Sequence, residues 1–276
     1  MKDQSFFQHI LRMAIYGLSS AIGITAFLAP FFSRAVQQDS GQMGSTATSP
    51  LLLTALVGLC FLALVFEVQG SMLGAKSVAL LGILVAMNAT LRFVEVAIPG
   101  PGGFSPIFLL IILSGYCFGS SFGFLMGVMT MFISAIITGG VGPWLPYQMF
   151  TAGWVGLSTG LLRRVTAALQ LQGRIELGLL GLFGAVWGFG YGMIINLWFW
   201  PWSTGAVAYY WTPGISVAET VQRYFAFYML TSFVWDALGA AGNVLLILSF
   251  GAPILRTLQR FYDRLVFVYQ PEWSSI

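Results

Sequence analysis

The chain alternates long apolar segments with short polar or glycine- and proline-rich connections. Residues 109–162 contain no Asp, Glu, Lys or Arg. A helix rises about 1.5 Å per residue and a bilayer core is about 30 Å thick, so this stretch is too long for one crossing and suits two or three. The whole pattern predicts candidate spans at residues 13–32, 51–66, 78–98, 107–119, 122–138, 145–162, 177–200 and 225–250. We therefore expect an all-α fold, a polytopic membrane helix bundle of about eight spans.

The boundary between the fourth and fifth segments is the least defined. Residues 107–119 are few for a crossing, and Gly115 and Gly119 blur the end of the segment. A count of seven spans therefore stays open.

A basic segment follows the last span. Residues 254–268 carry Arg256, Arg260 and Arg264 at four-residue spacing among apolar side chains. This spacing is typical of an amphipathic helix at a membrane surface. The chain then divides into an extension with two spans at 1–70, a six-helix substrate-binding core at 71–251 and a basic helix and tail at 252–276.

Composition and charge support a membrane protein and predict its orientation. Charged residues make up 8% of the chain, hydrophobic residues 58%, and the mean hydropathy is +0.85, whereas soluble domains carry about 25% charged residues. If eight spans cross the membrane and the N-terminus lies inside, the outer side carries three basic residues, Arg34, Arg92 and Arg223. The inner side carries the remaining basic residues: Lys2, Arg12, Lys76, Arg163, Arg164, Arg174, Arg256, Arg260 and Arg264. This bias predicts a multi-pass protein of the cell membrane with both termini in the cytoplasm.

Three aromatic connections fall on the outer face: PGPGGFSP after Ile98, GGVGPWLPYQ after Thr138, and WPWSTGAVAYYWTPG after Phe199. One interpretation is a belt of Trp and Tyr at the lipid headgroups. However, several of these aromatic residues lie within the loops rather than at helix ends, which suits lids over a pocket for a ring-containing ligand. Binding is favoured for this group, which includes Trp144, Tyr147, Tyr210 and Trp211.

Polar groups interrupt the apolar spans at a few places. Asn88, Arg92 and Glu95 follow one another at i, i+4 and i+7, so they share one helical face. They form either a self-satisfied Arg92–Glu95 pair near the surface, or the floor of an outward-facing site. Gln148 and Asn196 are milder cases of polar side chains in the same setting.

Asp236 is the most informative acid of the chain. On the predicted topology it lies near mid-membrane, about thirteen residues below Arg223, with Asn243 seven residues further along the same face. It is either a ligand-binding group or a packing group that is hydrogen-bonded to neighbouring backbone or to Arg92.

Small residues form stripes that let helix backbones approach closely. Ala75, Ala79, Gly82 and Ala86 line one face of the third span, and Gly239, Ala240 and Gly242 occur in the last. Internal packing is the default interpretation, and a docking face for another membrane subunit is the alternative.

The residues that catalysis needs are missing. The string from Gly70 to Ser77 has the wrong spacing for a P-loop, and Gly188-Phe-Gly190-Tyr-Gly192 lies within an apolar span, which favours helix packing over a dinucleotide turn. His9 is the sole histidine and the acids are scattered singly, so we expect no catalytic residue, no metal site, no cofactor and no enzyme activity. The thinly spread basic residues also argue against nucleic acid.

The block from Val78 to Phe250 resembles the substrate-binding S component of energy-coupling factor (ECF) vitamin transporters. The resemblance rests on the order and spacing of several motifs: Ala75-Lys-Ser-Val-Ala79 followed by ALLGILVAMNATLR, Gly115-Tyr-Cys-Phe-Gly119, Gly123-Phe-Leu-Met-Gly127, GGVGPWLPYQMFTAGWVGLSTGLL, and TSFVWDALGAAGNVLLIL. Individually these motifs are loose. The two N-terminal spans and the basic C-terminal helix depart from the family pattern.

The resemblance implies that the chain binds a vitamin or vitamin precursor, with a cobalamin-related compound as the first guess. It implies that an A-x-x-x-A stripe, here Ala75 and Ala79 extended by Gly82 and Ala86, contacts a coupling subunit of the membrane complex, and that separate subunits hydrolyse ATP. Substrate would enter from outside beneath residues 99–104, 144–148 and parts of 200–211. The candidate site residues are Asn88, Arg92, Glu95, Phe104, Trp144, Tyr147, Gln148, Asn196, Tyr210, Trp211 and Asp236.

Two other classes of function remain as alternatives. A stand-alone secondary transporter of a small organic solute is expected to contain inverted repeats, and the sequence shows no convincing internal repeat. A membrane enzyme is disfavoured because catalytic clusters are missing.

Overall fold

The computed structural model describes residues 2–36, 51, 54–55, 57–59, 74–98, 100, 102–203, 205 and 208–265. Regular structure within these ranges is helical: α1 (Lys2–Val36), α3 (Gly74–Ala97), α4 (Ile107–Phe118), α5 (Ser120–Thr138), α6 (Leu145–Ala168), α7 (Arg174–Asn196), the 3-10 helix η1 (Trp200–Trp202), α8 (Val217–Thr231) and α9 (Phe233–Leu265). The predicted all-α bundle is confirmed. The predicted second span, residues 51–66, lies mostly outside the described residues.

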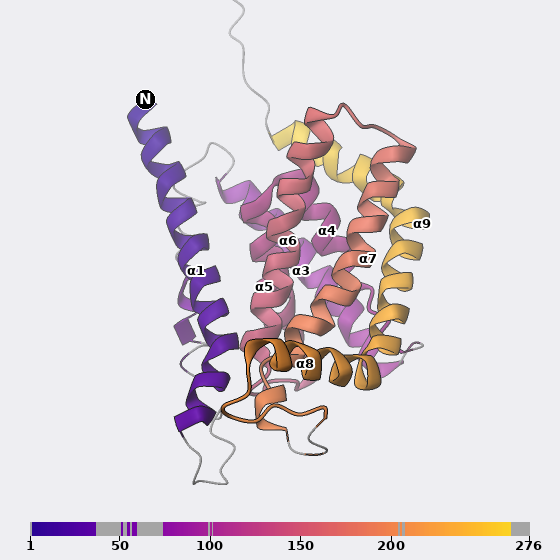
Figure 1. Cartoon of the computed structure of the whole chain (residues 1–276). Helices are drawn as coiled ribbons and strands as arrows, with labels where there is room; N and C mark the ends of the chain where they lie inside the picture. Colours follow the sequence, from indigo (N-terminus) through magenta and orange to yellow (C-terminus); the bar gives the residue numbers. More distant parts are fainter. Residues whose placement is uncertain are drawn as a thin grey trace, which may run out of the picture.

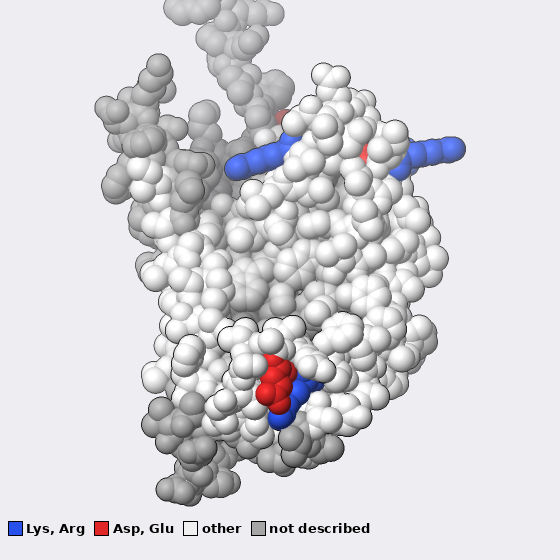
Figure 2. All heavy atoms as spheres, viewed as in Figure 1, with Lys and Arg blue, Asp and Glu red and all other residues white. Residues whose placement is uncertain are grey.

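The helices form a bundle with two chemically different ends. Figure 1 shows α1 alongside the other long helices, with α8 lying across one end. The basic end carries Lys76, Arg163, Arg164, Arg174, Arg256, Arg260 and Arg264. The opposite end, called the aromatic end below, carries the described residues of the connections at 98–106, 139–144 and 197–216. On the face shown in Figure 2, charged side chains lie near the two ends and a broad uncharged band separates them.

Several helices have the length and composition of membrane spans. Among the described residues these are Ala14–Phe32, Lys76–Ala97, Ser120–Thr138, Arg174–Trp202 and Phe233–Arg264, with the shorter apolar helix Ile107–Phe118. The uncharged band between the two ends matches this assignment, because charged side chains are costly in hydrocarbon.

Helix α4 is the centre of the bundle. It packs against α3, α5, α6, α7 and α9, and all its residues from Ile107 to Cys117 are buried. A helix that is apolar on every side is expected where protein surrounds it. Gly119, with φ of 97°, separates α4 from α5, a conformation that other residues rarely adopt. The structure therefore keeps the fourth and fifth segments apart and does not support the lower count that merges them.

Helices α5 and α6 touch backbone to backbone. A Cβ atom added to Gly123 would collide with the carbonyl group of Gly156, and one added to Gly127 would collide with Ala152. A Cβ on Gly156 would in turn collide with Gly123. Small residues permit this approach where lipid gives no hydrophobic drive for helix association.

Helices α7 and α9 also approach through small residues. Gly184, Gly188 and Gly192 lie four residues apart on the face of α7 that meets α9. A Cβ on Gly188 would collide with Ala240, and one on Gly192 with the Asp236 carboxylate. The interpretation of the Gly188–Gly192 string as helix packing is confirmed.

The predicted start of the last span, at residue 225, is wrong. Helix α8 ends at Thr231, Ser232 breaks the helix, and α9 begins at Phe233. Asp236 therefore lies in the first turn of α9, at the aromatic end rather than near mid-span. The hydropathy pattern misplaced this boundary because the C-terminal part of α8 is apolar, although α8 lies across the end of the bundle instead of along the other long helices (Figure 1).

The expected separate helix at residues 254–268 is also corrected. Residues 254–265 are the last turns of α9, which continues through Pro253 to Leu265. Proline removes a backbone donor and bends a helix, and in Figure 1 these last turns lean across the basic end. Residues 266–268 lie outside the described ranges.

The contact between α5 and α6 can be tested by substitution. We expect Gly123→Ala to lower the free energy of unfolding by about 1–3 kcal/mol, because the added methyl group overpacks the contact. The matched control is Gly178→Ala in α7, where a Cβ meets nothing within 4 Å. The control should be neutral or slightly stabilising, since Ala favours helix over Gly. The apparent melting temperatures of the two purified variants are compared in the same detergent, and Gly123→Ala should melt at the lower temperature. Equal melting temperatures would contradict the predicted contact.

Candidate ligand-binding cavity

A cavity of about 280 Å³ lies at the aromatic end, where α3, α6, α7, α9 and the connection after α3 meet. It brings together these residues predicted from sequence: Arg92, Glu95, Phe104, Gln148, Asn196 and Asp236. Its wall also contains residues that the sequence did not single out, among them Ser105, Tyr191, Ser232 and Trp235.

Arg92 and Glu95 form an ion pair on the wall of the cavity. Arg92 Nη1 donates to Glu95 Oε1, and Ser105 Oγ donates to Glu95 Oε2 at 2.6 Å. The two side chains are 28% and 15% exposed. The pair is therefore self-satisfied, as the first alternative predicts, and it also lines this cavity. An outward-facing site, the second alternative, stays a prediction. The remaining donors of the Arg92 guanidinium make no hydrogen bond to other described residues.

Asp236 lacks such compensation. Its Oδ2 atom is buried and has no hydrogen-bond partner within the described structure. The carboxylate rests against Gly192, where any side chain would collide with both oxygens. The hydroxyl of Tyr228 on α8 is buried and interacts with the Asp236 side chain, but the two groups do not reach the geometry of a full hydrogen bond. Burial and the nearby Asp236 carboxylate raise the pKa of this phenol, so Tyr228 stays protonated at neutral pH.

Further polar side chains come from α6 and α7. Asn196 Nδ2 donates to Ser232 Oγ at 2.7 Å, which ties the end of α7 to the break between α8 and α9. The Gln148 side chain, in the first turns of α6, lines the cavity and makes no hydrogen bond to the described residues. The cavity therefore offers an amide and part of a guanidinium as well as a carboxylate.

The connection after α3 packs directly on α9. A Cβ on Gly103 would collide with the Trp235 carbonyl group, and one on Gly242 with the Phe104 ring. Gly239 likewise lies against the Gly103 carbonyl. Gly102 and Gly103 thus let the loop lie close to α9 and place Phe104 and Ser105 on the cavity wall.

Asn88 lies outside the cavity wall. It is fully buried, and its Nδ2 atom donates to the Ile107 carbonyl at 3.0 Å and to Thr130 Oγ1 at 3.1 Å. These bonds tie α3 to α4 and α5. Asn243, similarly, donates to the Gly184 carbonyl at 3.0 Å and ties α9 to α7.

The aromatic residues that were expected in loops pack elsewhere at the same end. For two of them the expected position is wrong, because Trp144 is the N-cap residue of α6 and Tyr147 lies in its first turn. Tyr147 is buried and stacks on Trp198, with ring centroids 5.4 Å apart. Trp144 is 41% exposed, and its Nε1 donates to the Gly140 carbonyl at 3.2 Å. Trp211 packs with Phe31 of α1, at 5.5 Å between centroids. None of these three belongs to the described cavity wall.

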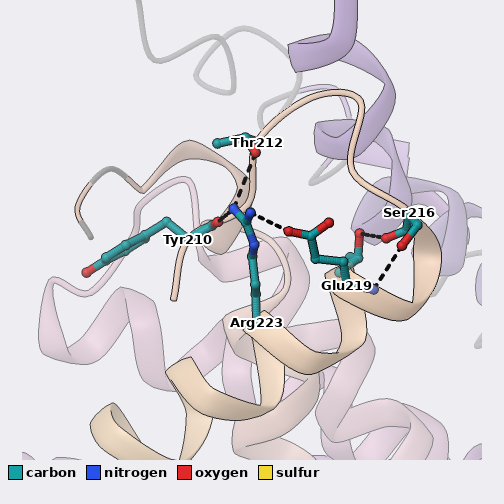
Figure 3. Close-up of polar contacts among 6 residues, drawn as sticks. Tyr210, Thr212, Ser216, Glu219 and Arg223 are labelled. Carbon is teal, nitrogen blue, oxygen red and sulfur yellow. Dashed lines mark hydrogen bonds and ion pairs between the residues drawn. The ribbon is translucent and has the colours of Figure 1, made fainter. Parts of the chain in front are cut away.

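Arg223 holds the connection between η1 and α8 in place. Figure 3 shows its guanidinium between the loop and the first turn of α8. Nη1 donates to the Tyr210 carbonyl at 3.0 Å, and Nη2 pairs with Glu219 at 2.5 Å. Ser216 caps the helix by accepting from the Glu219 backbone amide at 3.2 Å. Tyr210 thus contributes its backbone to this cluster, while its ring packs on Phe227.

The small-residue stripe of α3 faces outward. Ala79, Gly82 and Ala86 are exposed, and a Cβ on Gly82 would meet nothing within 4 Å. The side chain of Ala75 lies outside the described part of the structure. Internal packing, the default interpretation, therefore does not apply to the described part of the stripe.

The signal that sequence reasoning missed was the four-residue spacing of Gly184, Gly188 and Gly192. This spacing marks the helix face against which Asp236 lies. Tyr191 and Trp235 were hidden among many aromatic residues, and only packing separates them from the rest. Within the described ranges, His, Cys, Asp and Glu form no group of three that could hold a metal ion.

Comparison with known proteins gives one match. Residues 76–250, more than half of the chain, match the family model described as ECF transporter, substrate-specific component. No curated protein and no solved structure matches the chain.

The uncompensated charge of Asp236 predicts a stability effect. We expect Asp236→Asn to raise the free energy of unfolding by about 1–3 kcal/mol, because a partly buried carboxylate that lacks a countercharge is replaced by a neutral group of similar shape. Asp263→Asn, at an exposed position of the same helix, should have little effect. Melting temperatures in detergent without ligand measure both. A destabilised Asp236→Asn variant would mean that the carboxylate has a structural partner.

Proposed function

Because the chain belongs to the family of ECF transporter substrate-specific components, we propose that it captures a vitamin or vitamin precursor in the cavity at the aromatic end. Members of this family are transport proteins rather than enzymes, and they work with ECF coupling and ATPase subunits. The observation that carries the proposal is the cavity itself, where Arg92, Gln148, Asn196 and Asp236 converge among aromatic walls. A few polar groups in a largely apolar hollow are typical of small-molecule sites.

The aromatic end faces the outside of the cell in this proposal, and both termini lie in the cytoplasm. Support comes from the distribution of basic residues, which gather at the opposite end and which face the cytoplasm in most membrane proteins. The ligand would then enter beside the Gly102–Ser105 loop, which packs on α9 and borders the cavity.

The cavity favours a ligand of modest size. About 280 Å³ lies at the lower limit of the roughly 300–1,000 Å³ found for small-molecule sites. A compound with one or two rings fits such a volume. A cobalamin-related ligand, with its macrocycle of four linked rings, would need a much larger opening between α9 and the loop, so the smaller class is preferred here.

The exposed stripe of α3 is the proposed contact with the coupling subunit. Ala79, Gly82 and Ala86 present a shallow surface on which a partner helix can lie closely. The stripe is separate from the cavity-lining Arg92 and Glu95, which lie nearer the C-terminal end of the same helix. Binding and coupling are thereby assigned to different parts of α3.

The N-terminal extension comprises residues 1–70, and its described helix α1 is proposed to support the outer loops. Phe27 of α1 packs against Tyr147 at 5.0 Å between ring centroids, and Phe31 against Trp200 at 6.0 Å. Trp154 Nε1 of α6 also donates to Ser20 Oγ at 3.2 Å. The last turns of α9, from residue 252, are assigned to the cytoplasmic surface.

A stand-alone secondary transporter is the second candidate. The observation in its favour is the unpartnered Oδ2 atom of Asp236, since a buried carboxyl group can carry a coupling proton. Uptake by the purified chain alone in proteoliposomes, driven by an ion gradient, would support this candidate and contradict the proposed function.

Co-purification tests the proposed function and its division of labour. The tagged full chain, co-expressed with its coupling and ATPase subunits, should recover all of them, and uptake into vesicles should require ATP. Ala79→Leu should reduce recovery of the coupling subunit at least tenfold, because its larger side chain holds a partner helix away. Arg92→Ala should leave assembly intact and weaken substrate uptake.

The matched control for assembly is Ala21→Leu, on an exposed position of α1. It should assemble like the unmodified chain. Normal assembly of Ala79→Leu would remove the stripe from the proposed interface, and failure of the unmodified chain to bind any coupling subunit would refute the function itself.

Labelling of single cysteines tests the orientation. In a background without Cys60 and Cys117, we expect Ala218→Cys in α8 to react with a membrane-impermeant maleimide in intact cells. Gln172→Cys, between α6 and α7, should react only after lysis. Both positions are exposed, so access across the membrane decides the result. The reverse pattern would invert the topology.

A further inference from the structure

The cavity contains one acidic charge more than its basic residues neutralise. The charged side chains on its wall are Arg92, Glu95 and Asp236. Arg92 pairs with Glu95, and the second oxygen of Glu95 accepts from Ser105 at 2.6 Å. These two charges cancel each other, which leaves the carboxylate of Asp236 without a countercharge on the wall.

The surroundings of Asp236 provide no substitute for a cation. Its neighbour on α7 is the backbone at Gly192. The Asn196 amide donates to Ser232 instead. Tyr228, on α8, supplies only a neutral hydroxyl to the Asp236 side chain, and Oδ2 of Asp236 has no hydrogen bond of full geometry in the described structure. A carboxylate in such a site must take up a proton or meet a positively charged group.

The walls near Asp236 are aromatic. Trp235, Tyr191 and Phe104 line the same cavity, and aromatic faces attract cations through their quadrupole. A protonated nitrogen next to a carboxylate also makes a charge-assisted hydrogen bond, which is stronger than a neutral one. Carboxylate and rings therefore favour the same kind of ligand group.

Other groups of the wall suit acceptors on the ligand. The guanidinium of Arg92 has further N–H donors besides the one that binds Glu95. The side-chain amide of Gln148 makes no hydrogen bond to described residues. Carbonyl or hydroxyl substituents could bind there. An anionic ligand, in contrast, would face the uncompensated carboxylate of Asp236, and like charges disfavour its binding.

We propose that the cavity selects a cationic nitrogen compound of one or two rings, whose protonated nitrogen binds the Asp236 carboxylate. This assignment rests on the proposed function, because it names the substrate class of the same cavity. Gly192 is part of the selection, since the carboxylate occupies the space that a side chain at this position would fill.

A panel of probes tests the assignment on the purified full chain. The panel holds one- and two-ring heterocycles in matched sets that differ by an aminomethyl, a hydroxymethyl or a carboxyl group on the same ring, such as pyridoxamine, pyridoxine and 4-pyridoxic acid. Thermal stabilisation in detergent identifies binders, and calorimetry gives their affinity. We expect binders among the amines, at least tenfold tighter than their hydroxymethyl partners.

Variants connect the selectivity to the named residues. Asp236→Asn should weaken amine binding at least tenfold and remove the preference over the hydroxymethyl probe. Gly192→Ala should do so as well, by displacing the carboxylate. The controls are Asp263→Asn, exposed on α9, and Gly190→Ala, where a Cβ would meet Trp187 no closer than 3.6 Å. Both should bind like the unmodified chain.

The outcomes separate the substrate class from the proposed function. A panel in which amines bind no better than neutral or anionic probes, including a panel without any binder, overturns the cationic assignment. Unchanged selectivity in both Asp236→Asn and Gly192→Ala overturns it too. The proposed function survives these results as long as the chain still co-purifies with its coupling and ATPase subunits, and it fails independently if the chain does not.

Discussion

The architecture depends on helix backbones that approach one another without side chains between them. Gly123, Gly127 and Gly156 bring α5 onto α6, and Gly188 brings α7 onto Ala240 of α9. In lipid the hydrophobic effect does little to join apolar helices, so close packing between small residues has to stabilise the bundle. These contacts enclose α4, whose residues from Ile107 to Cys117 are buried, and they define where the helices diverge at the aromatic end.

The cavity forms where this close packing stops. Gly192 continues the glycine face of α7, but the residue opposite it is Asp236 rather than another small residue. The Gly102–Ser105 loop packs on the start of α9 and supplies Ser105 to Glu95. The same wall therefore contains one acid that is fully satisfied and one that is not, and this difference gives the cavity its chemical character.

The aromatic residues of the aromatic end fall into two groups. Tyr191, Trp235 and Phe104 line the cavity, whereas Trp200, Trp211 and Phe227 form a separate buried cluster with Phe31 of α1 packed against it. Arg223 attaches the intervening loop to α8 through the Tyr210 carbonyl group. This second cluster joins the described part of the N-terminal extension to the loops, so α1 is packed into the aromatic end of the core rather than attached beside it.

Hydrophobic periodicity and charge by themselves determined the membrane bundle, most helix positions and the separation of a basic from an aromatic end. These properties follow from local composition, because each crossing segment must be apolar along its own length. The motifs also indicated the family, and the polar residues Arg92, Glu95, Gln148, Asn196 and Asp236 stood out against apolar surroundings.

Only the tertiary structure decided which of these residues meet. Asn88 shares a helix face with Arg92 but bonds to Ile107 and Thr130, and Tyr147 packs on Trp198. The start of α9 at Phe233, which moves Asp236 to the aromatic end, depends on α8 packing across the bundle. A sequence pattern records what each segment can bury, whereas the partner that covers each face is selected by contacts between segments far apart in the chain.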